Sequence, residues 1–526
     1  MDLSLKHRPT LVHHFLEMAA DNRAERPAVC HNGVWTDYAA LESAANRWAR
    51  YYHSVGVQRG DRVALLLENS PEYISAHMAV FKAGAINVSL NTETTGETLR
   101  YLLEDCGAKV LVIAQKFVRH LANIAEMPPS LTHVVVDGDI VPDFLDRVGG
   151  VSLKRVHGEF ADARIACQAI DIDIASIVYT SGSTGKPKGV MLSHLNLVSN
   201  TDSTVSYLQL SDGDRAMVVL PFHYVYGTSL LYTHLAVGGS LVIENRFLYP
   251  NVVLDSMDQH KATGFAGVPT TFMLLLTKST LKSRRFESLR YVTQAGGRMA
   301  VAIQQQVQKA FDPAKLFIMY GATEAAPRMT YLAPDDLRRK WGSIGKAVPN
   351  VEVFPADSQG KRVPQGTHGE IVARGSNIMA GYWRDPVATA EVLRNGLYFT
   401  GDLGKEDAEG FLYIEGRAKD FIKVGGNRVG AQEIEDAILR IDAVAETAVI
   451  GVEDAVLGEA LKAFVVVKDN HTLSETDLRI KLQRLLPPFK VPKWIVFRSG
   501  LPKSAAGKIA KVKLKEEEAV SMPDTV

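Results

Sequence analysis

Apolar runs and amphipathic segments alternate through the first third of the chain, and their periods predict a parallel sheet covered by helices. Residues 62–67 form a continuous apolar run typical of a buried strand, and residues 71–84 follow with helical spacing between a proline and a glycine. A strand at 86–90, a helix at 95–107 and a strand at 109–114 continue the series. This β-α-β-α-β order favours one parallel sheet with helices on its faces.

The pattern changes beyond Gly369, where short strands and turns dominate, with predicted strands at 369–375, 396–402 and 409–417. The last part of the chain alternates helices and strands again and reads as a unit of its own. We therefore predict an α/β fold with a large N-terminal domain, residues 1–418, made of parallel-type sheets covered by helices plus a β-rich subdomain. A small, mobile α+β domain is predicted for residues 419–526.

Composition and charge narrow the function classes. The 526 residues are 46% hydrophobic and 22% charged, and 59 Lys and Arg balance 59 Asp and Glu. No global field draws such a chain to nucleic acid or to an anionic membrane, so any phosphate binding must be local. The scattered Cys30, Cys106 and Cys167 lack metal-type spacing and suit a reduced compartment. With no apolar signal core and no run long enough to span a bilayer, we expect a cytoplasmic protein.

The stretch VYTSGSTGKPKGVMLSH, residues 178–194, gathers hydroxyls, glycines and two lysines between a strand-like and a helix-like segment. Glycine lets backbone amides converge, while hydroxyl and ammonium groups donate to oxygens, so the composition indicates an anion site. A Walker A loop is excluded, because Pro187 follows Lys186 where that motif needs Ser or Thr. A flexible surface turn is the plain alternative. It is disfavoured because a loop after a buried strand lies at the carboxyl edge of a sheet, where ligands bind.

The segment YTSGSTGKPKGV, residues 179–190, resembles the phosphate loop of the adenylate-forming superfamily of acyl-CoA synthetases, peptide-synthetase adenylation domains and beetle luciferases. The resemblance covers almost the whole chain, because further family segments follow in the family's order. They are WTDYAAL, LLENSPE, LPFH, YGATE, YFTGD, GRAKDFIKVGGNRVGAQEIE and PKSAAGK. One such motif would be a weak signal, but the ordered series as a whole resembles the acyl- or aryl-CoA ligase branch.

The resemblance implies a reaction in two steps. A carboxylic acid and ATP form an acyl-adenylate and pyrophosphate with Mg²⁺, and the acyl group then passes to a thiol. Coenzyme A is the favoured thiol, and the phosphopantetheine of an acyl carrier protein is the alternative acceptor. An adenylating oxygenase like beetle luciferase and a non-catalytic scaffold are the other readings, and the intact motifs disfavour the scaffold.

The same resemblance assigns the nucleotide side of the site. Tyr320 is implied to stack on adenine, Thr323 to bond the α-phosphate, and Asp402 with Arg417 to hold the ribose. Glu324 is implied to bind Mg²⁺ together with the hydroxyl of Thr184, which suits a hard cation that keeps water and phosphate ligands. The remaining residues implied to bind the nucleotide are Thr180, Ser181, Gly182, Ser183, Gly185, Lys188, Gly296 and Gly297.

On the acyl side, His223 matches the position of an aromatic histidine near the reacting carboxylate in fatty- and aryl-acid ligases. A lone histidine after Pro-Phe is more often packed in a core. Peptide-synthetase domains for α-amino acids usually carry Asp here, and its absence argues against an α-amino acid, because a buried ammonium without a counter-ion is costly. An apolar acyl tunnel is expected to include Tyr224, Val225, Gly227, Val268, Gly297 and Gly321.

The small domain is implied to take part in both steps. Lys508 in PKSAAGK matches the lysine that reaches between the carboxylate and the α-phosphate, a role suited to a point charge on a flexible stem. Lys419 matches the hinge, and Gly425 with Gly426 would line the path of the incoming thiol. Gly430 and Ala431 depart from the bulkier residues or proline of many relatives, which affects only the thiol-side face.

Overall fold

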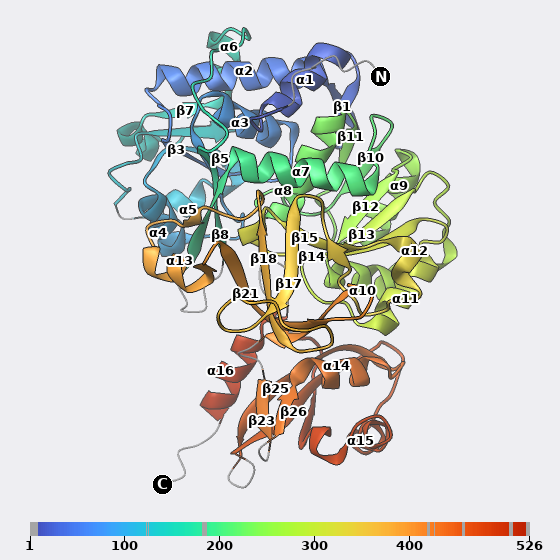
Figure 1. Cartoon of the computed structure of the whole chain (residues 1–526). Helices are drawn as coiled ribbons and strands as arrows, with labels where there is room; N and C mark the ends of the chain where they lie inside the picture. The colour runs from blue at the N-terminus through green and yellow to red at the C-terminus, as the bar shows by residue number, and fades with distance from the viewer. Residues whose placement is uncertain are drawn as a thin grey trace.

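In the computed structural model, the described residues are 9–122, 124, 126–180, 187–417, 421–424, 427–454, 458–503 and 509–521. Within them the chain forms three sheets in a large N-terminal part and a fourth sheet in a small C-terminal part (Figure 1). The predicted α/β class, with a β-rich subdomain and a separate α+β unit, is confirmed.

The first large sheet has nine strands in the order β16-β15-β14-β13-β12-β10-β11-β1-β2. The strands from β14 to β1 run parallel, β2 and β15 run antiparallel to them, and β16 pairs antiparallel with β15. Their bounds are β1 Pro27–His31, β2 Val34–Asp37, β10 Arg215–Val218, β11 Ser240–Ile243, β12 Gly264–Gly267, β13 Tyr291–Gln294, β14 Lys315–Gly321, β15 Arg328–Leu332 and β16 Lys346–Ala347.

The second large sheet has eight strands in the order β19-β9-β8-β4-β3-β5-β6-β7. It contains the strands predicted near residues 62, 86 and 109, which pair in parallel as expected. Its bounds are β3 Arg62–Leu66, β4 Ile86–Ser89, β5 Ala108–Ala114, β6 His133–Asp137, β7 Gly150–Ser152, β8 Ile174–Thr180, β9 Lys188–Ser193 and β19 Gly381–Tyr382.

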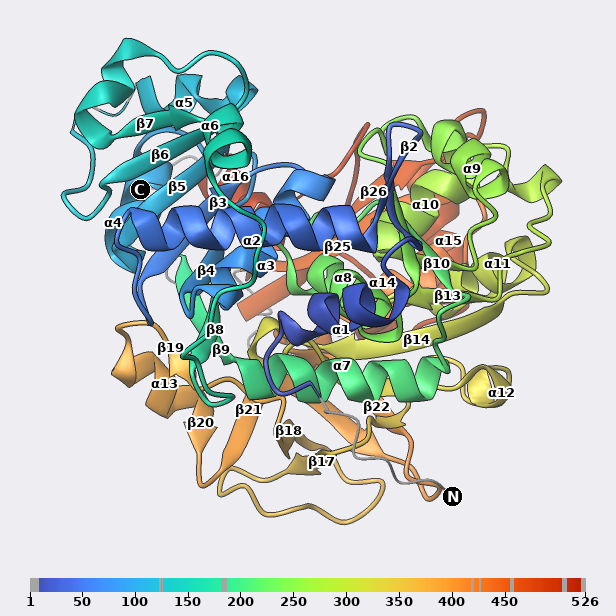
Figure 2. The same cartoon turned by 90° about the horizontal axis from the view of Figure 1, so that it is seen from above.

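Helices cover both large sheets, and the largest core cluster joins them. That cluster includes Val63 and Leu65 of β3, Val218 of β10 and Leu241 of β11, together with apolar residues of α2, α3, α7 and α8. Figure 2 shows α1 beside α2 over this core, and α7 packs along α8. The helices of the N-terminal part are α1 His14–Arg23, α2 Tyr38–Ser54, α3 Pro71–Lys82, α4 Gly96–Cys106, α5 Arg119–Ala122, α6 Leu153–Glu159, α7 His194–Leu208, α8 Val225–Val237, α9 Pro250–Gln259, α10 Pro269–Lys278, α11 Val301–Ala310, α12 Pro334–Leu337 and α13 Pro386–Val392.

The third sheet is antiparallel and corresponds to the predicted β-rich subdomain. It has the order β17-β18-β21-β20, and β22 pairs with β21. Its bounds are β17 Val351–Ala356, β18 Gly369–Gly375, β20 Leu393–Arg394, β21 Leu397–Glu406 and β22 Leu412–Arg417.

The C-terminal part has its own sheet, in the order β24-β23-β26-β25 with β27 paired to β26, and its own core around Ile434 and Val465. The sheets change between Arg417 and Phe421, while the predicted boundary itself, at 418/419, lies in residues outside the described ranges and stays a prediction. The elements are β23 Phe421–Val424, β24 Asn427–Gly430, α14 Ala431–Leu439, β25 Val444–Asp454, β26 Gly458–Val467, α15 Glu475–Gln483, β27 Trp494–Phe497 and α16 Lys511–Ser521.

None of the helices in the described ranges combines the length and the apolar character that crossing a bilayer requires.

Candidate active site

Four neighbouring parallel strands of the nine-stranded sheet end at one edge, and the loops after them carry most of the predicted site residues. The strands are β10, β12, β13 and β14. Ligands bind beyond the carboxyl ends of parallel strands in α/β sheets, so this edge is the expected place for a site. The first three loops carry, in that order, His223, Val268 and the pair Gly296 and Gly297, while residues 320–324 form the end of β14 and the turn after it.

A carboxylate, a phenol and a guanidinium meet beside the end of β14. The Tyr320 hydroxyl donates to Asp402 Oδ2 at 2.6 Å, and Arg417 Nε donates to Asp402 Oδ1 at 3.2 Å. The register of β21 and β22 sets Asp402 opposite Arg417, so the strand pairing itself brings acid and cation together. Burial and the Asp402 carboxylate raise the pKa of Tyr320, which keeps its hydroxyl a donor. The three residues predicted to hold adenosine are therefore in direct contact.

Glu324 lies in the short 3₁₀ turn Thr323–Ala325 after β14 and is oriented by a residue that the sequence analysis missed. The Tyr382 hydroxyl donates to Glu324 Oε1 at 2.8 Å. Burial and the charge of Glu324 raise the pKa of Tyr382, so this hydroxyl also stays protonated. The sequence signal that could have identified Tyr382 is the segment Gly-Tyr-Trp at 381–383, which lies between the family segments YGATE and YFTGD.

Lys188 faces the same tyrosine from the strand that follows the hydroxyl-rich loop. Its Nζ lies 5.3 Å from the Tyr382 ring centroid and 4.0 Å from Asp385 Oδ2. Tyr382 is placed there by the antiparallel pairing of β19 with β9, the strand that begins at Lys188. The quadrupole of an aromatic ring attracts an ammonium group over its face. Tyr382 therefore contacts both Lys188, through its ring, and Glu324, through its hydroxyl.

The predicted phosphate loop connects the two strands of an antiparallel hairpin. β8 and β9 pair with Thr180 opposite Lys188, and Thr180 Oγ1 donates to the Lys188 carbonyl oxygen at 3.4 Å. The hairpin fixes both ends of the loop beside β19. Residues 181–186 lie outside the described ranges, and the roles predicted for Ser181, Gly182, Ser183, Thr184 and Gly185 stay predictions.

Hydrogen bonds from the segment that follows β3 hold the loop that carries His223. The Asn69 side chain accepts from the Phe222 N–H at 2.8 Å and donates to the Leu220 carbonyl oxygen at 2.9 Å. The Tyr73 hydroxyl donates to the Phe222 carbonyl oxygen at 3.0 Å. Asn69 and Tyr73 lie just after β3, in and beside LLENSPE, a segment that the sequence analysis matched without giving it a role.

His223 is buried, with 8% of its surface exposed, and its Nε2 has no hydrogen-bond partner among the described residues. Burial lowers the pKa of His223 to about 4, so the ring is neutral at physiological pH. Its ring centroid lies 4.2 Å from that of Tyr224. A neutral aromatic ring that forms no ion pair with a carboxylate of the described residues suits an acid without an α-ammonium group.

Two of the predicted pocket glycines are explained by close backbone approach. A Cβ on Gly321 would lie 1.7 Å from the Pro327 carbonyl oxygen, and a Cβ on Gly227 would lie 2.0 Å from the Pro221 carbonyl oxygen. Only glycine fits at such distances. These residues shape the loops around the site by letting the chain fold tightly onto itself.

A cavity lies between α7 and α8, beside the turn that carries Glu324. Among the predicted pocket residues, only Val225 lines it. Six of its nine lining residues carry hydroxyl or amide groups, because Leu230, Leu231 and Leu235 of α8 pack into the core and its hydroxyl-bearing face is left to the cavity. The apolar acyl tunnel stays a prediction. The lining residues are Leu197, Asn200, Thr201, Thr204, Val225, Thr228, Ser229, Tyr232 and Ala326.

The C-terminal part contacts the site edge through charged residues. Arg298, which directly follows the glycine pair, forms an ion pair with Asp436 of α14 at 2.7 Å, and Lys278 of α10 pairs with Asp469. Leu439 of α14 packs against apolar clusters of both parts. The predicted catalytic lysine, hinge and thiol-side glycines lie outside the described residues, and their roles stay predictions; they are Lys508, Lys419, Gly425 and Gly426.

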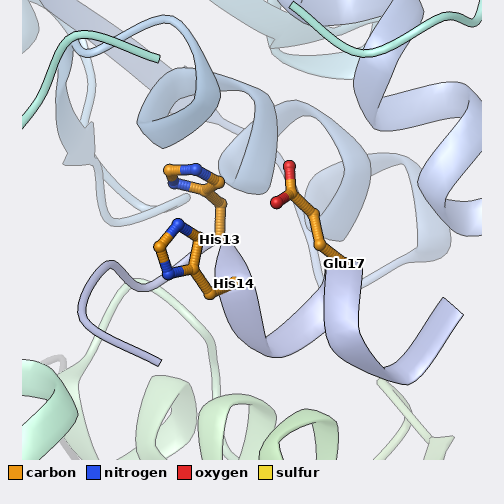
Figure 3. A group of neighbouring side chains, drawn as sticks. All are labelled: His13, His14 and Glu17. Atoms are coloured by element: carbon orange, nitrogen blue, oxygen red, sulfur yellow. The ribbon is translucent and has the colours of Figure 1, made fainter. Parts of the chain in front are cut away.

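A different group of possible metal ligands lies at the start of α1, away from this edge (Figure 3). His13, His14 and Glu17 bring ring nitrogens and a carboxylate within reach of one ion. The Glu17 carboxylate, however, already pairs with the buried ammonium of Lys82. Burial and the charge of Lys82 both lower the pKa of His13, and that same charge opposes a bound cation. We assign this group a structural role.

Comparison with known proteins agrees with this geometry. The chain matches the family described as AMP-binding enzyme over residues 16–383, and the AMP-binding enzyme C-terminal domain over residues 433–508. A long-chain-fatty-acid–CoA ligase of Bacillus subtilis is 31% identical over 522 residues, covering 94% of this chain and 92% of the relative. A feruloyl-CoA synthase of an Amycolatopsis species is 34% identical over 486 residues, covering 92% and 94%.

Solved structures extend the likeness to the fold. An anthranilate CoA ligase in complex with anthranoyl-AMP superposes with a TM-score of 0.90 at 28% identity, covering 99% of this chain and all of that one. An o-succinylbenzoate CoA synthetase of Bacillus subtilis with ATP and a magnesium ion gives 0.81 at 28%, covering 95% and 99%. The chain belongs to the AMP-binding enzyme family, in the branch of adenylate-forming acyl- and aryl-CoA ligases.

Proposed function

We propose that the residues at this sheet edge carry out the two steps of an AMP-forming acid–coenzyme A ligase, the reaction type of the family branch to which this enzyme belongs. In the first step a carboxylate oxygen attacks the α-phosphorus of ATP, forming an acyl-adenylate and releasing pyrophosphate. In the second step the thiol of coenzyme A attacks the acyl carbon, forming a thioester and releasing AMP. The observation that carries the proposal is the contact among Tyr320, Asp402 and Arg417 at the end of β14, at the sheet edge whose loops also carry Glu324 and His223.

The nucleoside of ATP is assigned to the contact among Asp402, Tyr320 and Arg417. A carboxylate held by two donors has remaining lone pairs for the ribose hydroxyls, and fixing it in advance lowers the entropy lost on binding. Thr323, one residue before Glu324, is assigned to the α-phosphate. These groups position the phosphorus atom that the acid attacks.

Magnesium fits Glu324. Its carboxylate is oriented through Oε1 by Tyr382, and no other described side chain donates to Oε2, so that oxygen is available to a hard cation. The hydroxyl of Thr184 is assigned as a second ligand. When bound, the ion supplies positive charge that offsets the charge of the phosphates and of the leaving pyrophosphate. Lys188 and the hydroxyl-rich loop add donors on the same side.

The acid is assigned to the space between His223 and the α7–α8 cavity. Because His223 is neutral and has no carboxylate beside it, we expect simple carboxylic acids to be better substrates than their α-amino counterparts. We assign Lys508 the role of neutralising the negative charge that builds up as the carboxylate and the α-phosphate react. Lys419, Gly425 and Gly426 are assigned to the domain turn and the thiol path of the second step.

Coenzyme A is the proposed acceptor, in line with the ligases to which the chain is similar, and a carrier-protein phosphopantetheine is the alternative. We place the enzyme in the cytoplasm, where both ATP and coenzyme A are supplied. The test incubates the enzyme with ATP, Mg²⁺ and a panel of carboxylic acids, with either coenzyme A or a phosphopantetheinylated carrier protein. Mass spectrometry should find acyl-coenzyme A. Acylation of the carrier alone would identify the alternative acceptor, and AMP release without either thioester would overturn the proposal.

A further inference from the structure

A fully buried asparagine holds the turn that carries Thr323 and Glu324. Asn377 has 0% of its surface exposed and lies between β18 and β19. Its Nδ2 donates to the Ala325 carbonyl oxygen at 2.9 Å and to the Arg328 carbonyl oxygen at 2.8 Å. A side-chain amide has two N–H donors, and both are used here. The Asn377 side chain therefore bridges the two ends of the segment 325–328, which leaves the turn.

The backbone at the end of this turn has a conformation that alanine disfavours. Ala326, which follows the 3₁₀ turn Thr323–Ala325, has a φ of 55°, in the left-handed region. A residue with a Cβ is sterically crowded there and stays in that region only where the surrounding structure holds it. Local hydrogen bonds give part of this support, because the Ala326 N–H donates to the Thr323 carbonyl oxygen at 3.3 Å. Further support comes from a distant segment.

That support comes from residues 376–382, which we call the bracket segment. Besides the Asn377 amide, the Met379 N–H of this segment donates to the Glu324 carbonyl oxygen at 2.9 Å. The Tyr382 hydroxyl donates to Glu324 Oε1 at 2.8 Å. Glu324 is therefore bonded to the bracket segment through both its main chain and its carboxylate, while Asn377 holds the peptide that follows it.

The bracket segment is anchored to the hairpin whose loop is predicted to bind phosphates. Its last two residues form β19, which pairs with β9. Asn196, in the first turn of α7, donates through Nδ2 to the Ser376 and Ile378 carbonyl oxygens at 2.8 and 2.9 Å. Asn196 is fixed in turn by a capping box with Ser193, the last residue of β9. The turn that carries Glu324 is thus tied to the strand that follows the predicted phosphate loop.

A second buried asparagine has similar bonds but lies elsewhere in the molecule. Asn46 of α2 has 4% of its surface exposed, and its Nδ2 donates to Glu42 Oε1 at 3.2 Å and to the Asp162 carbonyl oxygen at 2.9 Å. In Asn46 and Asn377 alike, Oδ1 is buried without a hydrogen-bond partner among the described residues. Helix α2 lies at the top of Figure 1, away from β14, β18 and β21. Asn46 therefore separates an effect on the site from an effect on stability alone.

We propose that Asn377 is a positioning residue for the first step, which sets Thr323 toward the α-phosphate and Glu324 toward Mg²⁺ by holding the turn that carries both. This inference rests on the proposed function and adds a residue to that site. Without the amide, the buried Ala325 carbonyl oxygen loses this donor, and the turn relaxes away from its present conformation. A misplacement of about 1 Å at a reacting group lowers a rate by as much as about a hundredfold.

The test compares the wild-type enzyme with Asn377→Leu and Asn46→Leu, each of which replaces a buried amide by an apolar side chain of similar shape. Acid-dependent exchange of labelled pyrophosphate into ATP is measured across titrations of ATP and of Mg²⁺. Asn377→Leu should raise KM for ATP and the half-maximal Mg²⁺ concentration by at least roughly tenfold each, because Thr323 and Glu324 share the turn. Asn46→Leu should lower the midpoint of thermal unfolding and leave both values unchanged.

Calorimetry of ATP binding in the presence of Mg²⁺ gives a readout that does not depend on turnover. The Kd should rise in Asn377→Leu by a factor similar to that of KM and stay unchanged in Asn46→Leu. Circular dichroism checks that each variant is folded. If Asn377→Leu does not fold, Asn377→Ser, which keeps one hydroxyl donor, takes its place. It should change the same values in the same direction by a smaller factor.

The outcomes separate this inference from the proposed function. An unchanged KM for ATP and an unchanged Mg²⁺ requirement in a folded Asn377 variant would overturn the positioning role and leave the ligase intact. Equal changes in Asn377→Leu and Asn46→Leu would also overturn it, since they would reflect lost stability and not the position of the turn. Wild-type enzyme that binds ATP but shows no exchange with any acid of a broad panel would contradict the ligase and this inference together.

Discussion

Tyr382 orients the carboxylate on which the metal side of the site depends. Its hydroxyl donates to Glu324 Oε1 at 2.8 Å, and its ring lies under Lys188 Nζ. A hydrogen bond to a charged group contributes about 1.5–3 kcal/mol, enough to decide which of several rotamers a partly buried carboxylate adopts. The orientation of the Glu324 carboxylate therefore depends on Tyr382, which is 58 positions away in the sequence.

We expect Tyr382→Phe to raise the Mg²⁺ concentration needed for half-maximal pyrophosphate exchange by roughly tenfold, since one hydrogen bond to a charged group is lost. The exchange rate measured across a magnesium titration checks this. Tyr413→Phe is the matched control, because it removes a tyrosine hydroxyl near Asp407, away from Glu324. A Tyr382→Phe variant with an unchanged magnesium requirement would show that Tyr382 does not position Glu324.

Tight turns, and hydrogen bonds between segments that are distant in the sequence, hold the elements around the site in place. The loop after β10 is clamped by Asn69 and Tyr73, and α8 begins where Gly227 passes the Pro221 carbonyl oxygen. The sequence showed the strands, the helices and the order of the motifs, because these follow local periodicity. It did not show the clamps, since they join residues that are about 150 positions apart in the chain.

Gly227→Ala should therefore destabilise the protein strongly. The new Cβ would lie 2.0 Å from a backbone oxygen, so α8 or its preceding loop must move. We expect a loss of about 2–4 kcal/mol in the free energy of unfolding, in the range of overpacked sites. Urea unfolding measures it. Gly158→Ala is the control, because a Cβ there meets nothing within 4 Å and alanine favours the helix α6. Equal stability of both variants would contradict the close approach.

The arrangement of sheets and helices was the most predictable part of the fold. The side chains that line its cavity were the least predictable. Alternating strands and helices indicated the parallel sheets, and the ordered motifs indicated the edge at which they meet. The polar wall of the α7–α8 cavity was missed because α8 is largely apolar in sequence, and only its packing shows which face meets the core.

Buried histidines distributed over the N-terminal part make stability depend on pH. Burial lowers the pKa of His77 to about 3 and the pKa values of His194 and His223 to about 4. The unfolded chain then binds more protons than the folded chain below about pH 6.5, so stability is full above that pH and falls as the pH drops toward 4. One pKa unit corresponds to about 1.4 kcal/mol. The midpoint of thermal unfolding should fall steeply between pH 6.5 and 4.5, and a constant midpoint across that range would contradict neutral buried histidines.

The small domain is expected to serve the two steps separately. Lys508→Ala should slow acyl-adenylate formation at least about a hundredfold, the effect of losing about 3 kcal/mol of transition-state stabilisation. The same variant should convert synthetic acyl-adenylate and coenzyme A to thioester at nearly the wild-type rate. Lys419→Pro should do the opposite, because fixing φ at the hinge resists the turn between steps. Measuring both half-reactions on both variants checks this, and equal damage to the two steps by Lys508→Ala would contradict a moving domain.

The most direct test of the ligase assignment is acid-dependent exchange of labelled pyrophosphate into ATP, measured on the full-length enzyme with a broad panel of carboxylic acids. Label should enter ATP only when a suitable acid and Mg²⁺ are both present. Adding coenzyme A should then give the acyl thioester and AMP in equal amounts. Absence of exchange with every acid, from folded protein that binds ATP, would contradict the assignment.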